Sequence, residues 1–327
     1  MYRTIFVPLD GSDLAERALP YAARLASLGV ARLVLARVIR EPDAAAPESF
    51  QEDVRARREA KDYLDAVVER HLSLPGLRPP ETFVVSGEPA PALLELAQRE
   101  RASLIVMGTH GRSGIGRWLY GSVAERVLHE AHVPVFLVPT TAPAGWPADR
   151  PPRVLVPLDG SAFATEAIAA AAPLIEGLRA DVVLVRVVEP AIYVASPYGP
   201  MYAAPAVGTP EALAAAEDYV ESVAAPLRRK GYTASAVVRE GYPANELARV
   251  ASDGLIDVIA MATHGRTGLA RLVLGSVATA TLRHANVPLL LVRPEALRTP
   301  GGGHQEEHAE APAGSPAGAP KPVGAAA

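Results

Sequence analysis

The sequence has no cysteine, only three lysines and no long apolar run. Without cysteine in its 327 residues, the chain has no thiolate nucleophile, no cysteine zinc site and no disulfide. No apolar run approaches the roughly 18 residues that a membrane span needs, and the net charge of −4 offers no basic surface for nucleic acid. The chain enters a strand pattern at once, so we expect no signal peptide. We therefore expect a cytoplasmic protein without membrane or nucleic-acid partners.

A glycine pattern occurs twice at matching places in the chain. Met107-Gly108-Thr109-His110-Gly111-Arg112 is followed by Gly121-Ser122-Val123, with nine residues between Gly111 and Gly121. Met261-Ala262-Thr263-His264-Gly265-Arg266 is followed at the same spacing by Gly275-Ser276-Val277. Each copy follows a short apolar run and precedes a helical stretch. This context places a turn after a strand and a Gly-Ser pair at a helix start. Free backbone N–H groups and the helix dipole there favour phosphate.

The repeat extends well beyond the glycine pattern. The stretch 7–12, Val-Pro-Leu-Asp-Gly-Ser, recurs at 156–161, an offset of 149 residues. The offset becomes 154 at Gly87 and Gly241 and stays so at the Gly-Ser pairs. A period near 150 residues indicates two domains in tandem. We predict domains at 1–140 and 153–295, a linker at 141–152, and a disordered Ala/Pro/Gly-rich tail at 296–327.

Each half alternates strand and helix signals, which is typical of an α/β fold. In the first half, we expect strands near 3–9, 31–39, 81–86, 103–108 and 134–138, and helices near 13–28, 52–72, 89–100 and 120–131. The first helix has Asp13 and Glu16 at capping-box spacing. The pattern predicts two open, doubly wound, five-stranded parallel sheets. Ligands of such sheets bind beyond the carboxyl ends of the strands, where the strand order reverses.

The last strands of the two halves, near 133–138 and 287–292, are strongly apolar. An exposed apolar edge strand promotes aggregation, so we expect these strands to be covered. Pairing of the two halves within one chain would cover them, and a homodimer is a further assembly open to the protein.

The motif Gly-x2-Gly-x9-Gly-Ser, with Pro-Leu-Asp-Gly-Ser ending the first strand, resembles the ATP-binding branch of the universal stress protein family. The resemblance spans nearly all of residues 1–295, twice. It implies an adenine nucleotide, ATP or ADP or AMP, with Mg²⁺, at the carboxyl edge of each sheet. Carried over by position, the first site comprises Pro8, Leu9, Asp10, Val38, Met107, Gly108, Gly111, Arg112, Gly121, Ser122 and Val123. The second comprises Pro157, Leu158, Asp159, Val187, Met261, Ala262, Gly265, Arg266, Gly275, Ser276 and Val277.

Several of these residues also have a purely structural interpretation. Ser122 and Ser276 are residues of the type that caps helices, and Asp10 and Asp159 are suited to cap the turns that follow them. Ala262 replaces the first glycine of the motif. It would strain a backbone with positive φ by roughly 1 kcal/mol, but would be harmless if the site only needs a small side chain.

The arginines and histidines of the motif leave two roles open. Arg112 and Arg266 would contact phosphate or remain solvated. For His110 and His264 we expect a role in the loop structure rather than in catalysis, because no cysteine, carboxylate pair or serine triad accompanies them. We predict no catalytic residue and no protein metal site.

Three functions compete on the sequence alone. The first is a nucleotide-binding stress or regulatory module, and the second is a slow ATP hydrolase. The third is a scaffold whose second site no longer binds. The chain has no P-loop, and no lysine lies near the glycine motif to reach the terminal phosphates. We therefore expect a binding protein with at most weak ATPase activity.

Overall fold

The computed structural model describes residues 1–29, 31–41, 49–73, 75–109, 121–190, 209–264 and 274–295. Its strands form one ten-stranded sheet in the order β3-β2-β1-β4-β5-β10-β9-β6-β7-β8. The order within each half is that of a doubly wound sheet, and β1 and β6 lie where the order reverses. The expected α/β fold with parallel sheets is confirmed, and the two sheets are joined into one.

The described elements of the first half follow the expected alternation closely. They are β1 (Thr4–Pro8), α1 (Asp13–Glu16), α2 (Leu19–Gly29), β2 (Arg32–Ile39), α3 (Ser49–Val67), the π-helix η1 (Val68–Leu72), β3 (Glu81–Ser86), α4 (Pro89–Arg99), β4 (Leu104–Gly108), α5 (Ser122–Glu130) and β5 (Val135–Val138). Continuously apolar strands form because helices cover both faces of the sheet.

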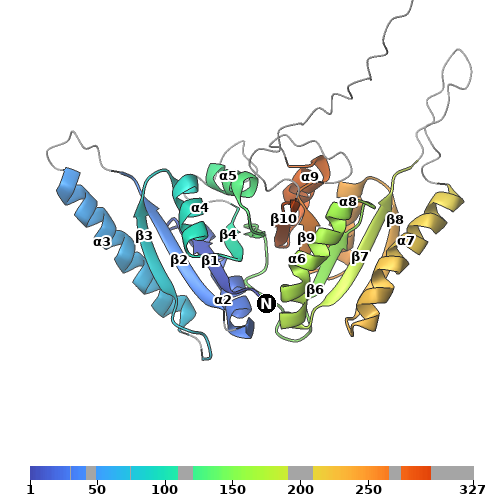
Figure 1. Cartoon of the computed structure of the whole chain (residues 1–327), viewed down its shortest axis with the longest axis horizontal. Helices are drawn as coiled ribbons and strands as arrows, with labels where there is room; N and C mark the ends of the chain where they lie inside the picture. Colours follow the sequence, from blue (N-terminus) through green and yellow to red (C-terminus); the bar gives the residue numbers. More distant parts are fainter. Residues whose placement is uncertain are drawn as a thin grey trace, which may run out of the picture.

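The second half repeats this plan. Its elements are β6 (Arg153–Pro157), α6 (Ala162–Leu178), β7 (Asp181–Val188), α7 (Pro210–Arg229), β8 (Ala234–Glu240), α8 (Pro243–Asp253), β9 (Val258–Ala262), α9 (Ser276–His284) and β10 (Leu289–Val292). Pro89 and Pro243 open their helices, where a missing N–H is harmless. The helices α3 and α7 lie at opposite ends of the molecule, whereas α2 and α6 meet in the middle (Figure 1).

The seam between the halves is the antiparallel pair β5–β10. Leu137 lies opposite Leu289, Phe136 opposite Leu290, and Val135 opposite Leu291. All other described strand pairs are parallel. The expected pairing of the two halves through their last strands is therefore present within one chain.

The hydrophobic core crosses this seam on both faces of the sheet. One cluster contains side chains of β1, α2, β5, α6 and β10, and the other combines side chains of α4, α5, α8 and α9 with the strands between them. The Tyr2 hydroxyl of the first half donates to the Ala170 carbonyl of the second at 3.0 Å. The two halves are thus packed against one another as one body.

The segment predicted as a linker is packed against both halves. Trp146 contacts the rings of Tyr21 and Phe136, with ring centroids 5.2 and 5.7 Å apart. On the other side, Arg150 donates to both carboxylate oxygens of Asp257 at 2.6 and 2.9 Å. The linker therefore binds the first half through aromatic packing and through hydrogen bonds that Arg17 and Tyr21 donate to the Ala142 and Pro143 carbonyls, and the second half through a bidentate ion pair.

The first helices of the two halves differ, and the expectation of one continuous helix in the first half was wrong. A single helix near 13–28 is replaced by the four-residue α1 and a separate α2, whereas α6 runs unbroken for 17 residues. The helix is capped by Ser12, whose hydroxyl accepts from the Ala15 N–H at 3.2 Å, and not by Asp13 as the capping-box spacing indicated. The predicted tail at 296–327 lies outside the described residues.

Candidate functional site

The candidate site lies at the carboxyl ends of β1 and β4 in the first half, and of β6 and β9 in the second. The strands β1 and β4 are parallel neighbours, with Ile5 opposite Leu104 and Phe6 opposite Ile105. The loops after both strands therefore leave the same edge of the sheet, at the point where the strand order reverses.

The Gly-Ser pairs begin helices at this edge, as the motif predicted. Gly121 is the N-cap of α5 and Gly275 that of α9, with nearly identical backbone angles (φ −54°, ψ 150° and 149°). The Gly121 N–H donates to the Thr109 carbonyl at 2.7 Å, and the Gly275 N–H donates to the Thr263 carbonyl at 2.8 Å. These bonds hold each helix start against the strand end. The N–H groups of the next three residues have no acceptor within the helix.

Close backbone approach, and not positive φ, explains the glycine at this position. A Cβ at Gly275 would lie 3.1 Å from the Thr263 carbonyl oxygen, which is tighter than ordinary contact. The interpretation of Ser122 and Ser276 as N-caps was wrong, because both are the first residues inside their helices and neither helix has a side-chain cap. Both serines are exposed at the helix start.

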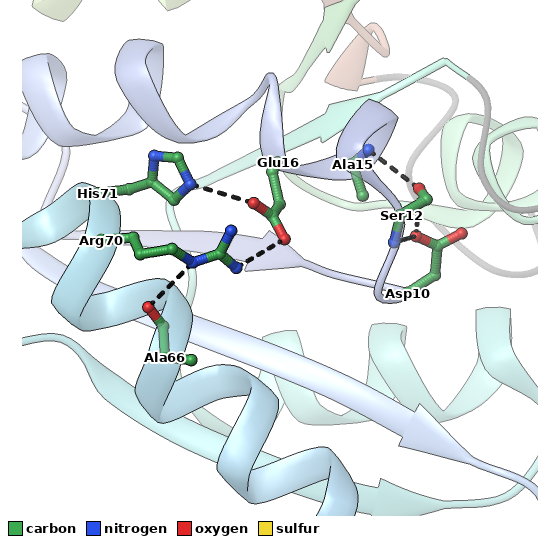
Figure 2. Close-up of polar contacts among 7 residues, drawn as sticks. All are labelled: Asp10, Ser12, Ala15, Glu16, Ala66, Arg70 and His71. Carbon is green, nitrogen blue, oxygen red and sulfur yellow. Dashed lines mark hydrogen bonds and ion pairs between the residues drawn. The ribbon is translucent and has the colours of Figure 1, made fainter.

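The Asp-Gly-Ser turns of the two halves have the same internal geometry (Figure 2 shows the first). Asp10 Oδ1 accepts from the Ser12 N–H at 2.9 Å and from the Ser12 hydroxyl at 2.6 Å. Asp159 makes both bonds to Ser161 at the same distances. The glycine between them is left-handed in each turn, with φ of 89° at Gly11 and 87° at Gly160.

The structure decides between the two interpretations of Ala262. Ala262 and Gly108 end the strands β9 and β4, and each pairs in parallel with a valine of the neighbouring last strand. Neither residue is among those with positive φ. Alanine therefore imposes no backbone strain here, which leaves the interpretation that the site needs only a small side chain.

The sequence matches the family model described as "Universal stress protein family" at residues 1–139 and again at 152–293. The chain belongs to this family. A universal stress protein from Mycobacterium bovis is 28% identical over 308 residues, covering 88% of this chain and 96% of the relative. One from Thermus aquaticus is 35% identical over 139 residues, covering 42% of this chain and 99% of the relative.

The arrangement of both halves is also found in a solved structure. A universal stress protein from Archaeoglobus fulgidus has a TM-score of 0.68 at 20% identity, and the match covers 89% of this chain and 98% of that one. At this identity, the likeness concerns the fold. The protein is thus a tandem universal stress protein.

The other predicted site residues of this universal stress protein lie around the same edge, at different depths. Leu9 and Leu158 are buried behind the Asp-Gly-Ser turns, and their N–H groups donate to Ala36 and Val185 at 2.8 and 2.7 Å. Met107 and Met261 are core residues, each 6% exposed. Pro8 is buried at the end of β1. The remaining members are partly buried at the strand ends and helix starts: Val38, Val123, Pro157, Val187 and Val277.

Part of each motif lies outside the described residues, namely His110, Gly111, Arg112, Gly265 and Arg266. His264 is described, and its Nδ1 lies 3.0 Å from the Thr263 hydroxyl. Within the described ranges, no group of three His, Asp or Glu side chains could hold a metal ion. No described helix has the length and apolar character needed to cross a membrane.

Residues that the motif did not indicate surround the Asp-Gly-Ser turns. Tyr63 of α3 lies under Arg37 of β2, with 4.6 Å between the guanidinium carbon and the ring centroid. Burial first, then the Glu16 carboxylate, and more weakly Asp10, raise the pKa of Tyr63. In the second half, burial and then the charge of Asp159 raise the pKa of Tyr219. The repeated Asp-Tyr pairs at 62–63 and 218–219 are the sequence signal that would have revealed both tyrosines.

Arg37 and Arg186 occupy equivalent positions, and the contacts described for them differ. Arg186 donates to the Leu158 carbonyl at 3.1 Å and so supports the backbone directly before Asp159. Arg37, 149 residues earlier, stacks on Tyr63. The same residue type therefore braces the turn in one half through the backbone, and in the other packs against the third helix.

Proposed function

We propose that this tandem universal stress protein binds ATP or a related adenine nucleotide in each half, as a cytoplasmic stress-response or regulatory module. The observation that carries the proposal is the duplicated helix start at the sheet edge. In each half, a nine-residue helix begins at a glycine that is hydrogen-bonded to the end of the neighbouring strand. Such a helix start presents free N–H groups and the positive end of the dipole to an anion.

The residues at this edge fit a nucleotide. The absence of a Cβ at Gly275 lets the helix start lie close to the Thr263 carbonyl at the end of β9. In each half, the N–H groups after the N-cap glycine and the exposed serine hydroxyl would hold phosphate, while the Asp-Gly-Ser turn and Val38 or Val187 would line the nucleoside. Mg²⁺ would be bound chiefly by the phosphate oxygens, because the described ranges offer no three-ligand protein site for it.

Binding without a dedicated catalytic step accounts best for the residues present. In P-loop and kinase sites, which transfer the terminal phosphoryl group, a lysine reaches the phosphates and a further residue positions the nucleophile. The sequence places no lysine near either glycine motif. Slow hydrolysis of bound ATP remains the alternative activity, since any site that gathers phosphate and Mg²⁺ stabilises some transition-state charge.

Calorimetric titration of ATP with Mg²⁺ tests the proposal, using the wild type and the Gly121→Val and Gly275→Val variants. We expect two sites in the wild type and the loss of one in each variant. Valine at either glycine is expected to obstruct the site. The backbone angles there are open to any residue, but a Cβ at Gly275 would lie 3.1 Å from the Thr263 carbonyl oxygen, so the thermal unfolding of each nucleotide-free variant is measured beside the titration. The unaltered half of each variant is its own control.

Other results would change the proposal in defined ways. A single wild-type site, lost only in Gly121→Val, would make the second half a structural partner. No heat and no thermal stabilisation with ATP, ADP or AMP would contradict nucleotide binding and favour a scaffold.

A further inference from the structure

The Asp-Gly-Ser turn of the first half leads into a helix that is too short to hold itself in place. The helix α1 has only four residues and ends before α2 begins, whereas the corresponding turn of the second half leads into the 17-residue α6. One helical turn in isolation is unstable because its nucleation costs more than its few hydrogen bonds return. The first turn therefore depends on tertiary contacts for its position.

Ala15 of α1 is buried in the core, and Arg17 directly after the helix donates to the Ala142 carbonyl. The side chain that joins α1 to the end of α3 is that of Glu16, the last residue of α1. Its side chain is only 10% exposed, and the carboxylate faces the π-helix η1 at the end of α3 (Figure 2). Arg70 Nη2 lies 3.4 Å from Oε1, and His71 Nε2 lies 3.1 Å from Oε2. Tyr63 also lies beside this carboxylate. Its hydroxyl is buried, and burial and then Glu16 raise the pKa of Tyr63, while Arg37 lowers it and Asp10 raises it more weakly.

A short chain of bonds joins this carboxylate to the candidate site. The Glu16 N–H donates to the Ser12 carbonyl at 3.2 Å, and the Ser12 N–H and hydroxyl both donate to Asp10 Oδ1. Arg70 is itself oriented by donating through Nε to the Ala66 carbonyl at 3.3 Å. Five residues separate Asp10 from Glu16, so a displacement of α1 moves the turn with it.

The second half lacks the residue types for such a contact. Thr165 occupies the position of Glu16, and its hydroxyl donates to the Ala162 carbonyl within its own helix at 2.6 Å. With α3 and α7 aligned on their Asp-Tyr pairs, Pro226 and Leu227 stand where Arg70 and His71 are. The second turn is held by the continuity of α6 instead.

We propose that Glu16 is a positioning residue for the first nucleotide site alone, anchoring α1 and the Asp10 turn to η1 through Arg70 and His71. The inference rests on the proposed function. It adds that the two sites respond differently to one change: loss of the Glu16 contact weakens the first site and leaves the second as it was.

The test is a two-site titration of ATP with Mg²⁺ into Glu16→Gln, repeated in the Gly275→Val background so that only the first site contributes. Glutamine preserves the volume of the side chain and removes its charge. We expect the first-site Kd to rise about fivefold, the effect of losing a modest ion pair. The matched controls are Thr165→Ala at the equivalent position and Glu59→Gln, which breaks the exposed Arg55–Glu59 pair of α3. Both are expected to change neither Kd.

Two further measurements separate positioning from general structural support. Arg70→Lys retains the positive charge and is expected to preserve the first-site Kd. Arg70→Met removes the charge and is expected to raise that Kd. Hydrogen exchange in the nucleotide-free protein is expected to accelerate at residues 10–16 of Glu16→Gln and to stay unchanged at 159–165.

The contrary outcomes are distinct. Equal weakening of both sites, or an unchanged first-site Kd while both sites bind, would overturn the role of Glu16. No binding at either site of the wild type would contradict the proposed function itself.

Discussion

The two Asp-Gly-Ser turns are nearly identical inside and differ in what holds them. The hydrogen bonds that Asp10 and Asp159 accept have the same lengths, 2.9 and 2.6 Å, and the glycines of both turns have the same left-handed conformation. The first turn is supported by a side-chain contact from a four-residue helix, and the second by an unbroken helix of 17 residues. A repeated motif thus reports the local geometry of a site, whereas its rigidity depends on surroundings that the repeat does not share.

A charged substitution in the β5–β10 pair is the strongest test of whether the two halves are separate units. Leu137 is fully buried opposite Leu289, so Leu137→Lys places a charge in the shared core. We expect the free energy of unfolding to fall by about 4 kcal/mol, and the two halves to unfold in separate transitions. Urea unfolding and sedimentation velocity would measure both effects.

Gln98→Lys, on an exposed position of α4, is the control, because it adds the same charge outside the core. Unchanged sedimentation and unfolding in Leu137→Lys would mean that the halves do not depend on this seam.

The linker offers a second contrast, because it binds the two halves by different forces. We expect Trp146→Ala to lower the free energy of unfolding by about 2 kcal/mol through lost aromatic packing, with little dependence on salt. Asp257→Asn breaks the ion pair with Arg150 and is expected to cost about 1 kcal/mol, an effect that shrinks as salt screens the charges. Urea unfolding at low and high salt would separate the two. Equal salt dependence in both variants would contradict this division.

The parts of the fold with strong apolar periodicity could be predicted from sequence. The strands fall where their apolar runs are, and the edge argument for 133–138 and 287–292 identified the seam correctly. The break after Glu16 could not be predicted. Pro20 and Pro173 both lie within stretches of helical pattern, yet the chain breaks just before Leu19 and Pro20, whereas α6 continues through Pro173. Proline disfavours a helix interior, but the surrounding packing decides whether the helix ends.

The candidate site was predictable where the backbone repeats, and not where side chains from distant elements meet. The positions of Gly121 and Gly275 followed from the spacing of the motif. Glu16, Arg70 and His71 are brought together because η1 packs against α2, directly after α1, across more than 50 residues of sequence. No local pattern encodes that contact.

The smallest expected effect tests whether Ala262 distinguishes the two sites. Because Gly108 and Ala262 are paired strand residues without positive φ, we expect Gly108→Ala and Ala262→Gly to change the free energy of unfolding by less than about 1 kcal/mol. We also expect each Kd for ATP with Mg²⁺ to change less than about twofold, a shift well under 1 kcal/mol. Titration and urea unfolding of both variants would measure this. If Gly108→Ala abolished the first site while the protein remained folded, the alanine at 262 would by the same chemistry exclude nucleotide from the second half. The two halves would then differ in ligand binding itself, and not merely in how their turns are held.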